Sequence, residues 1–90
     1  MIIVLLVTKT CQQGDGNGNP EVFVGKANDM DDCVRKVRLQ HLGANGASFK
    51  TCGDGSESGC GNCFAEYDMD GSNDNKDFKT CSIQTGRICG

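Results

Sequence analysis

The sequence predicts a small, disulfide-rich α+β domain in which one helix packs on an antiparallel sheet. Seven cysteines occur in 90 residues, a density typical of small scaffolds from oxidising compartments that use disulfides to support a thin core. One segment, residues 28–43, has the apolar periodicity of a helix, and the segments on either side of it are typical of short strands. The predicted order is strand, strand, helix, strand, strand, strand.

The first residues form an apolar segment that we expect to be a strand. Residues 1–7 are uncharged and apolar, and polar and apolar positions do not alternate until Thr8, a pattern that favours burial on both faces. The run is too short to span a bilayer, which takes about 20 apolar residues. It also lacks the basic start and the cleavage site of a secretory signal. Residues 11–20 combine glycines, asparagines and the only proline, which predicts a loop or hinge.

Two interpretations of residues 1–10 stay open. They form either a central strand in the sheet of their own domain, residues 11–90, or a donor strand that completes the sheet of a neighbouring copy. A donor strand binds through main-chain hydrogen bonds and buries its side chains in the acceptor. A donor and an acceptor on one chain give a heterologous contact, which closes into a ring or continues as a filament. The expected subunit interface consists of Ile2, Ile3, Val4, Leu5, Leu6 and Val7.

A short strand over residues 21–26 is expected before the helix. The helix is expected to begin at Asn28 or Asp29, because both are good N-cap residues and acidic residues follow in the first turn. Gly43 is the expected stop. The face predicted to be buried has helical spacing and consists of Met30, Cys33, Val34 and Val37.

Three strands are expected after the helix. The first runs over residues 45–52 and is followed by a loop over residues 53–59. The second places alternate residues on one face, namely Cys63, Ala65, Tyr67 and Met69. A polar loop over residues 70–76 leads to the last strand, at residues 78–83.

Charge and residue types exclude several classes of function. Acidic residues outnumber basic residues and the net charge is −3, so we expect no nucleic-acid partner. His41, the only histidine, has no evident nucleophile or carboxylate partner, and we expect no enzyme. The absence of tryptophan weakens a glycan site, although Tyr67 and the phenylalanines leave one open. No Asn-x-Ser/Thr pattern occurs, so attached glycans would be O-linked.

A CxxC motif at Cys60 and Cys63 has the spacing of a redox or zinc site. A redox motif needs its first cysteine at the start of a helix, whereas this motif leads into a predicted strand. A zinc site would need a second CxxC or a pair of histidines. Structural disulfides are therefore the expected role of both cysteines.

The acidic segment over residues 66–77 resembles a calcium-binding loop. Oxygen ligands stand at alternate positions, with a glycine at the sixth position and a carboxylate at the twelfth. Asn73 stands where an apolar residue is usual, and no flanking helices are predicted, so a solvated acidic turn is the alternative. The candidate calcium ligands are Glu66, Asp68, Asp70, Asp74 and Asp77.

The segment from Cys33 to Cys81 resembles a small cysteine-rich module of extracellular proteins from aquatic invertebrates. The residues that carry the resemblance are Cys33-Val34, Ala44-Asn45-Gly46-Ala47-Ser48-Phe49, Cys63-Phe64-Ala65-Glu66-Tyr67, Gly71-Ser72-Asn73 and Thr80-Cys81. The resemblance implies an extracellular, disulfide-bonded protein without a particular activity. Together with proximity in the predicted fold, it implies the bridges Cys33–Cys63, Cys52–Cys60 and Cys11–Cys81, and it leaves Cys89 unpaired or available for a bond between copies.

These observations favour a secreted structural protein, a subunit of an extracellular filament or matrix. Its partners would be copies of itself, joined by exchange of the N-terminal strand. The alternative is an extracellular module that binds glycans or calcium.

Overall fold

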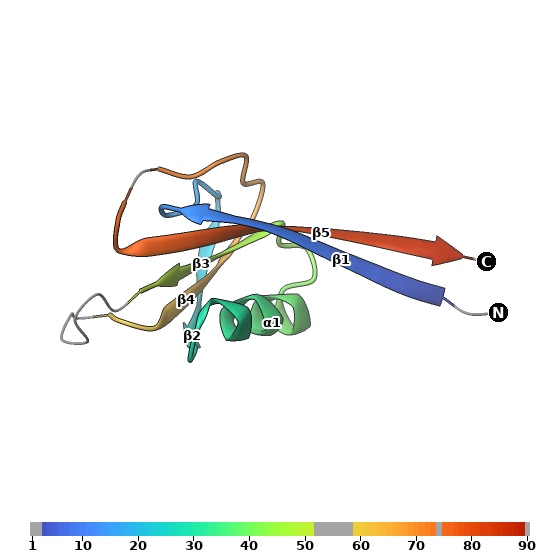
Figure 1. Ribbon diagram of the computed structural model, residues 1–90, viewed down its shortest axis with the longest axis horizontal. Helices are drawn as coiled ribbons and strands as arrows, with labels where there is room; N and C mark the ends of the chain where they lie inside the picture. Colours follow the sequence, from blue (N-terminus) through green and yellow to red (C-terminus); the bar gives the residue numbers. More distant parts are fainter. Residues whose placement is uncertain (1–2, 52–58, 74, 90) are drawn as a thin grey trace.

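The computed structural model describes the backbone of residues 3–51, 59–73 and 75–89, and the side chains of the described residues between 10 and 83. In this part of the chain, antiparallel strands form one sheet in the order β1-β5-β3-β4-β2, and the helix α1 packs on one face (Figure 1). The elements in chain order are β1 (Ile3–Gln13), β2 (Glu21–Lys26), α1 (Met30–Gln40), β3 (Gly46–Lys50), β4 (Asn62–Glu66) and β5 (Phe78–Cys89). The predicted α+β class is confirmed.

The helix begins with a reciprocal pair of capping hydrogen bonds. The N-cap Asp29 accepts a hydrogen bond from the Asp32 amide at 2.8 Å, and the Asp32 carboxylate accepts one from the Asn28 amide at 2.9 Å. The Asn28 amide, together with Lys36 and Arg35, lowers the pKa of Asp32 to about 2. The expected helix start is confirmed.

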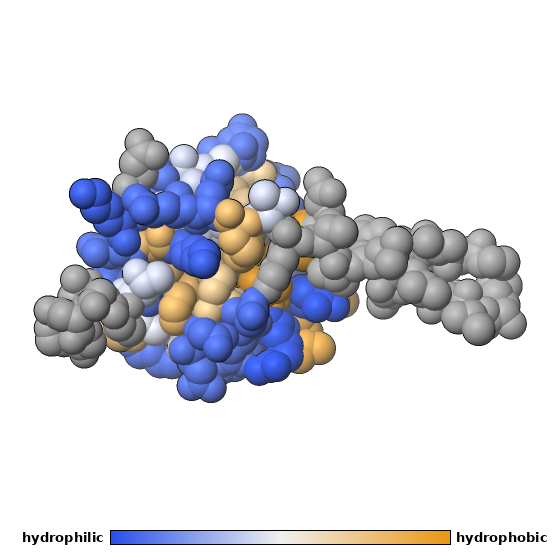
Figure 2. Space-filling model, viewed as in Figure 1, coloured by the Kyte–Doolittle hydropathy of each residue, from blue (hydrophilic) through white to orange (hydrophobic). Residues whose placement is uncertain are grey.

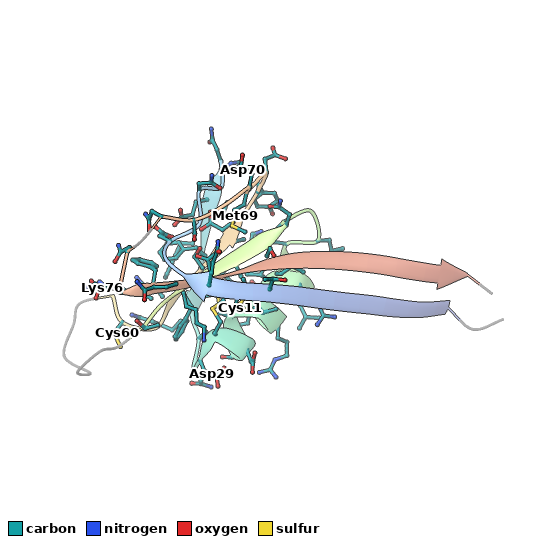
Figure 3. The ribbon with its side chains drawn as sticks, turned by 45° about the horizontal axis from the view of Figure 1, so that its top comes forward. Cys11, Asp29, Cys60, Met69, Asp70 and Lys76 are labelled. Carbon is teal, nitrogen blue, oxygen red and sulfur yellow. A yellow bond between two sulfur atoms is a disulfide. The ribbon has the colours of Figure 1, made fainter. Side chains whose placement is uncertain are left out.

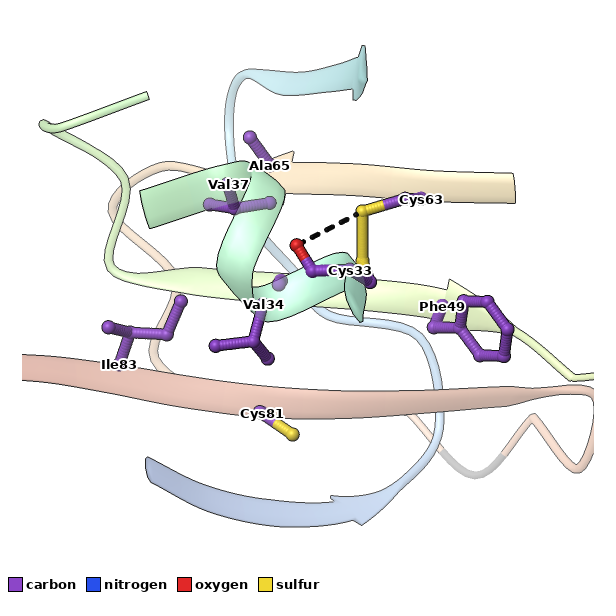
Figure 4. Packing of buried hydrophobic residues seen from close by; sticks show 9 residues of the cluster. Cys33, Val34, Val37, Phe49, Cys63, Ala65, Cys81 and Ile83 are labelled. Atoms are coloured by element: carbon purple, nitrogen blue, oxygen red, sulfur yellow. Dashed lines mark hydrogen bonds between the residues drawn. A yellow bond between two sulfur atoms is a disulfide. The ribbon is translucent and has the colours of Figure 1, made fainter. Parts of the chain in front are cut away.

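The core lies between α1 and the sheet face that the helix covers (Figure 4). Its buried members are Cys33, Val34 and Val37 of α1, with Ala47, Phe49, Cys63, Ala65, Cys81 and Ile83 of the sheet. Met30, also predicted for the buried helix face, packs partly buried against this cluster. Because cysteines are prominent among the buried residues, disulfide sulfur fills part of a core that a short chain cannot make large.

Two disulfides connect elements that lie far apart in the sequence. Cys33 of α1 is bonded to Cys63 of β4, and Cys11 of β1 is bonded to Cys81 of β5. Both pairs are ones that the resemblance and the predicted proximity implied. The first fastens the helix to the sheet, and the second fastens the edge strand to its neighbour.

The N-terminal strand β1 lies at an edge of the sheet. It pairs antiparallel with β5, with Ile3 opposite Cys89 and Gln13 opposite Lys79. The strand therefore belongs to the sheet of its own chain, as the first interpretation has it, but the predicted central position is wrong. Since β3 occupies the inner side of β5, β5 offers β1 only its outer edge, and β1 has no strand on its other side within the described sheet.

The outer parts of β1 and β5 project from the body as a two-stranded arm (Figure 1). We define the arm as residues 3–8 and residues 84–89, which pair only with each other in the described sheet. The arm makes the molecule 50 Å long, against 23 and 19 Å in the other directions. β5 thus continues past its predicted end at Ile83, because β1 supplies the hydrogen-bonding partner that a longer strand needs.

Strand β4 ends at Glu66, short of the predicted Met69. Asp68 has a φ of 52°, a left-handed conformation that turns the chain out of the sheet. Tyr67 packs against the core as predicted, whereas Met69 lies over Gly46 on the opposite face.

Candidate functional site

The sheet face opposite α1 carries a buried group of polar side chains. Alternation along the strands places Ser48, Glu66 and Thr80 on this face, and all three are at most 1% exposed. The register of β2 and β4 sets Glu21 directly opposite Glu66. Burial of a carboxyl group is strongly unfavourable unless it is hydrogen-bonded or neutral, so the surroundings of Glu66 decide its state.

The loop between β1 and β2 covers these polar groups. The predicted loop or hinge of residues 11–20 is shorter in the structure, because residues 11–13 belong to β1. Residues 14–20 fold back over the face, and the Gly18 amide donates to Glu66 Oε1 at 2.9 Å. The Gly16 amide donates to Ser48 Oγ at 3.0 Å. A Cβ atom on Gly18 would lie 2.4 Å from Glu66 Oε1. Glycine therefore lets the loop backbone lie directly on the carboxyl group.

The Ser48 hydroxyl has more acceptor neighbours than it has hydrogens. Its Oγ atom lies 2.7 Å from Glu66 Oε2 and 3.0 Å from Thr80 Oγ1, and it is also hydrogen-bonded to the Asp15 carboxyl. Thr80 donates its own hydrogen to Gly14 O at 2.6 Å. Oδ1 of Asp15 is buried without a hydrogen-bond partner among the described residues. Acceptor oxygens thus outnumber hydrogens at this site.

Asp15, Glu21 and Glu66 form what we call the carboxyl cluster, with one oxygen from each within 4.8 Å of the others. Burial raises the pKa of Asp15 and the pKa of Glu66 above their ordinary values. Burial, followed by the negative charges of Glu66 and Asp15, raises the pKa of Glu21 to about 7. The Glu21 and Glu66 carboxyls are hydrogen-bonded to each other, and such a bond requires a proton on one of them.

Only Glu66, among the candidate calcium ligands, belongs to the carboxyl cluster. Asp70 instead accepts a hydrogen bond from the Asn17 side chain, and Asp74 lies outside the described residues. The two others are exposed, namely Asp68 and Asp77. Calcium binding by the acidic segment therefore stays a prediction.

Asp15 and Glu21 are cluster residues that the sequence did not indicate. The alternation of side chains along a strand places Glu21 on the same face as Phe23 of β2 and Glu66 on the same face as Phe64 of β4. This alternation is the only hint that the sequence gives of the two positions. Alternation within each strand does not show that β2 and β4 are neighbours in the sheet. The loop contact that brings in Asp15 has no local signal beyond the glycines that permit it.

Three phenylalanine rings lie on the same sheet face beside the carboxyl cluster. The centroids of Phe23 and Phe64 are 5.5 Å apart with ring planes at 57°, and those of Phe64 and Phe78 are 6.3 Å apart at 46°. Phe23 is 56% exposed. Because the rings are tilted, they do not form one flat platform for a sugar ring. A glycan partner stays a prediction.

His41 has a partner that the sequence did not indicate. Its Nδ1 atom lies 2.8 Å from the Tyr67 hydroxyl, and the two rings meet edge to face. His41 is also the C-cap of α1, and its amide donates to Val37 O at 2.7 Å. The contact therefore fastens the end of the helix to the segment that follows β4.

The two cysteines of the CxxC motif are not bonded to each other. Cys63 is bonded to Cys33 of the helix, and Cys60 is also in a disulfide. The predicted partner of Cys60, Cys52, lies outside the described residues. Cys63 thus has a structural role, as the sequence analysis expected.

The predicted subunit interface falls on the arm. Residues 3–7 pair with residues 85–89, whereas Ile2 lies outside the described residues. The backbone of Cys89 is opposite Ile3 at the tip, and a bond between copies through Cys89 stays a prediction. Figure 3 shows Cys11 where β1 joins the body, so the Cys11–Cys81 bond fixes the base of the arm.

An apolar groove of about 500 Å³ lies between the end of α1 and the base of the arm. Ile83 of β5 lines it together with Leu39 and Leu42, which are 74% and 89% exposed. Apolar surface is visible in orange near the point where the arm leaves the body (Figure 2). Exposed apolar surface beside a strand that begins with the apolar residues 3–7 is typical of a protein that associates with others.

No helix in the described ranges is long and apolar enough to cross a membrane. Comparison with known proteins assigns no family to this chain. No protein-family model, no curated protein and no solved structure matches it.

Proposed function

We propose that this chain is a secreted structural subunit whose copies assemble into an extracellular filament or matrix by exchanging residues 1–10. The observation that carries the proposal is the arm. Its strands have each other as their only partner in the described sheet, and residues 3–7 are apolar and uncharged. An isolated two-stranded ribbon is at best marginally stable in water, so the arm gains from a partner.

The β1 edge of the arm lacks the features by which monomeric proteins protect an exposed strand, whereas the β5 half of the arm contains Arg87. Neither a proline nor a charged residue occurs from Ile3 to Thr8, and the register with β5 runs without a shift from Ile3 opposite Cys89 to Thr8 opposite Gln84. Charges, prolines and bulges are the usual means of preventing edge-to-edge association. Their absence supports association as a function of this segment.

Exchange would reuse contacts that the fold already contains. Residues 3–8 of one copy would pair with residues 84–89 of the next, in the register that joins them within one chain. The Cys11–Cys81 bond keeps the rest of β1 on its own body, which limits the exchanged segment to residues before Cys11. Exchange of an identical element is a low-barrier route to assembly because no new interface has to be built.

The disulfides support an extracellular location. Bonds such as Cys33–Cys63 and Cys11–Cys81 form and persist in oxidising compartments and are rare in the cytosol. The Cys11–Cys81 bond at the base of each arm also suits an assembly under tension, because a force on the exchanged strand is transmitted to β5 through a covalent bond.

Deletion of residues 1–10 is expected to convert an assembling protein into a monomer that is lighter than the 9.6 kDa full chain. Light scattering after size exclusion, without reductant, measures the change. The truncated chain keeps Cys11, so formation of the Cys11–Cys81 bond serves as the control for folding. A full chain that is monomeric, or a truncated chain that assembles normally, would contradict the proposal.

A cysteine pair at Val7 and Thr85 is expected to report exchange directly. These residues are opposite each other, four positions along the ladder from Cys11 and Cys81, and so occupy the same type of pair as that disulfide. In a Cys89→Ser background, oxidation of assembled V7C/T85C protein should give a ladder of covalent multimers on a non-reducing gel. The V7C single variant is the control and should give no ladder. Covalent dimers alone would indicate closed reciprocal exchange, and monomers alone would exclude exchange.

A further inference from the structure

The carboxyl cluster has a geometry that requires a bound proton or cation, and it lies apart from the arm. Glu66 has no exposed surface, and Glu21 and Asp15 face it from β2 and from the loop over residues 14–20. The charges that act on Glu21 are those of Glu66 and Asp15, and both are negative. Three ionised carboxylates with oxygens within 4.8 Å of one another would repel, and the repulsion would cost most at Glu66, which is buried.

We propose that Glu21 and Glu66 share one proton, and that this proton acts as a pH-sensitive latch that holds the loop of residues 14–20 on the sheet. In the closed state the Glu21 carboxyl carries the proton and donates it to the Glu66 carboxylate. Glu66 then accepts from Glu21, from Ser48 Oγ at 2.7 Å and from the Gly18 amide at 2.9 Å. Opening transfers the proton from Glu21 to solvent water and leaves both groups ionised.

The assignment of the proton to Glu21 follows from the donors around Glu66, because Ser48 Oγ and the Gly18 amide stabilise the ionised form of that carboxyl. Glu21 is exposed, so its carboxyl can exchange a proton with solvent, whereas Glu66 is fully buried among donors that stabilise its ionised form. The hydrogen bond between them raises the pKa of Glu21 and lowers that of Glu66, as expected for a donor and its acceptor. The pair titrates as a unit, and its upper step falls near pH 7.

The loop and the strands that pack on the carboxyl cluster each contribute a polar side chain. The loop contributes the Asp15 carboxyl, while β3 and β5 contribute the neutral hydroxyls of Ser48 and Thr80. Arg35 and Lys36 pair with Asp32 on α1, which packs on the other face of the sheet. A proton and a cation compete for these oxygens, and the hydrogen bond between the Glu21 and Glu66 carboxyls, which needs a hydrogen, favours the proton.

The stability of the folded state depends on pH because the folded and unfolded states bind the proton of Glu21 with different affinities. The pKa of Glu21 is raised from 4.5 to about 7 in the folded protein, so the folded state binds the proton more tightly than the unfolded state. Stability from this source is fully present below pH 4.5 and is lost as the pH rises through about 7. The loop should then loosen first, because Gly16 and Gly18 bond to Ser48 and Glu66.

The test uses the full oxidised chain and follows the carboxyl carbons of Glu21 and Glu66 by NMR between pH 4 and 9. We expect Glu21 to titrate near pH 7 and the Gly18 amide to lose protection from hydrogen exchange over the same interval. Glu21→Gln, which keeps a hydrogen-bond donor but cannot lose it, should abolish the pH dependence. Asp68→Asn removes a charge from an exposed position and is the matched control, which should keep it.

Two results would overturn the latch. Titration of Glu21 near its ordinary value of 4.5, with no change in Gly18 protection up to pH 8, would show that no proton is held. Recovery of Gly18 protection at pH 8 on addition of millimolar calcium chloride would assign the cluster to a cation instead. The wild-type titration decides the question even if Glu21→Gln fails to fold.

Discussion

Replacement of Cys33 and Cys63 together by alanine should lower the free energy of unfolding by roughly 3 to 4 kcal/mol. The bond closes a loop with a sequence separation of 30, and loop closure of that length in the unfolded chain accounts for about this amount. Both residues are fully buried, so the missing sulfurs also leave space in the core beneath α1. For a domain of this size, the melting temperature should fall by roughly 15 °C or more.

Thermal unfolding followed by circular dichroism measures the effect, and the double variant Cys11→Ala and Cys81→Ala provides the comparison. Its loop is longer, with a sequence separation of 70, and loop entropy alone predicts a loss of about 4 to 5 kcal/mol. Cys11 is exposed, however, and its removal leaves α1 fastened to the sheet. The helix signal should therefore weaken early on heating only when the Cys33–Cys63 bond is missing. Equal melting temperatures for wild type and C33A/C63A would contradict a supporting role for this bond.

The local elements of the fold were predictable because their signals are local. The helix has its cap at Asp29, its acidic first turn and its apolar spacing within a few residues, and β2 has the predicted bounds Glu21–Lys26. The length of β5 was not predictable, because residues 84–89 become a strand only where β1 lies beside them. A segment without its own pattern takes its structure from its partner.

The N-terminal segment is a strand, as predicted, but its predicted position in the sheet is wrong. An unbroken apolar run normally indicates burial on both faces of a central strand, yet β1 lies at the edge of the sheet. Composition does not specify strand order, because order is decided by which neighbours the rest of the chain leaves free. The conflict between an apolar sequence and an edge position is also the main support for assembly through the arm.

The carboxyl cluster was hidden for a related reason. Its members are separated by up to 51 positions, from Asp15 to Glu66, and the register Glu21 opposite Glu66 is a property of the paired strands. In the sequence, the glycines of the loop predict a flexible hinge, whereas in the structure they permit close packing of the backbone on the sheet. A glycine-rich segment such as residues 11–20 is thus compatible with both a hinge and a lid, and sequence alone does not separate them.

Gly14→Ala is the single substitution in the loop from which we expect the largest loss of stability, roughly 3 to 5 kcal/mol. Gly14 has a φ of 119°, which side chains rarely adopt, and an added Cβ would lie 1.8 Å from the backbone oxygen of Asn73. Backbone cannot move aside as a side chain can, so the loop must shift. Two hydrogen bonds would then be lost, from the Gly14 amide to Phe78 O and from Thr80 Oγ1 to Gly14 O.

Gly25→Ala separates the strain of the backbone from the steric overlap. Gly25 has a similar φ of 131° at the irregularity in β2, but no atom lies within 4 Å of the Cβ that alanine would add. The Gly25→Ala variant should therefore lose only the free energy that comes from backbone strain, roughly 1 to 3 kcal/mol of stability. Urea unfolding of both variants measures the difference, and comparable losses would mean that the loop does not rest on Asn73. In Gly14→Ala the shifted loop should also expose Glu66 to water, so the pKa of Glu21 should fall toward 4.5, whereas Gly25→Ala should leave it near 7.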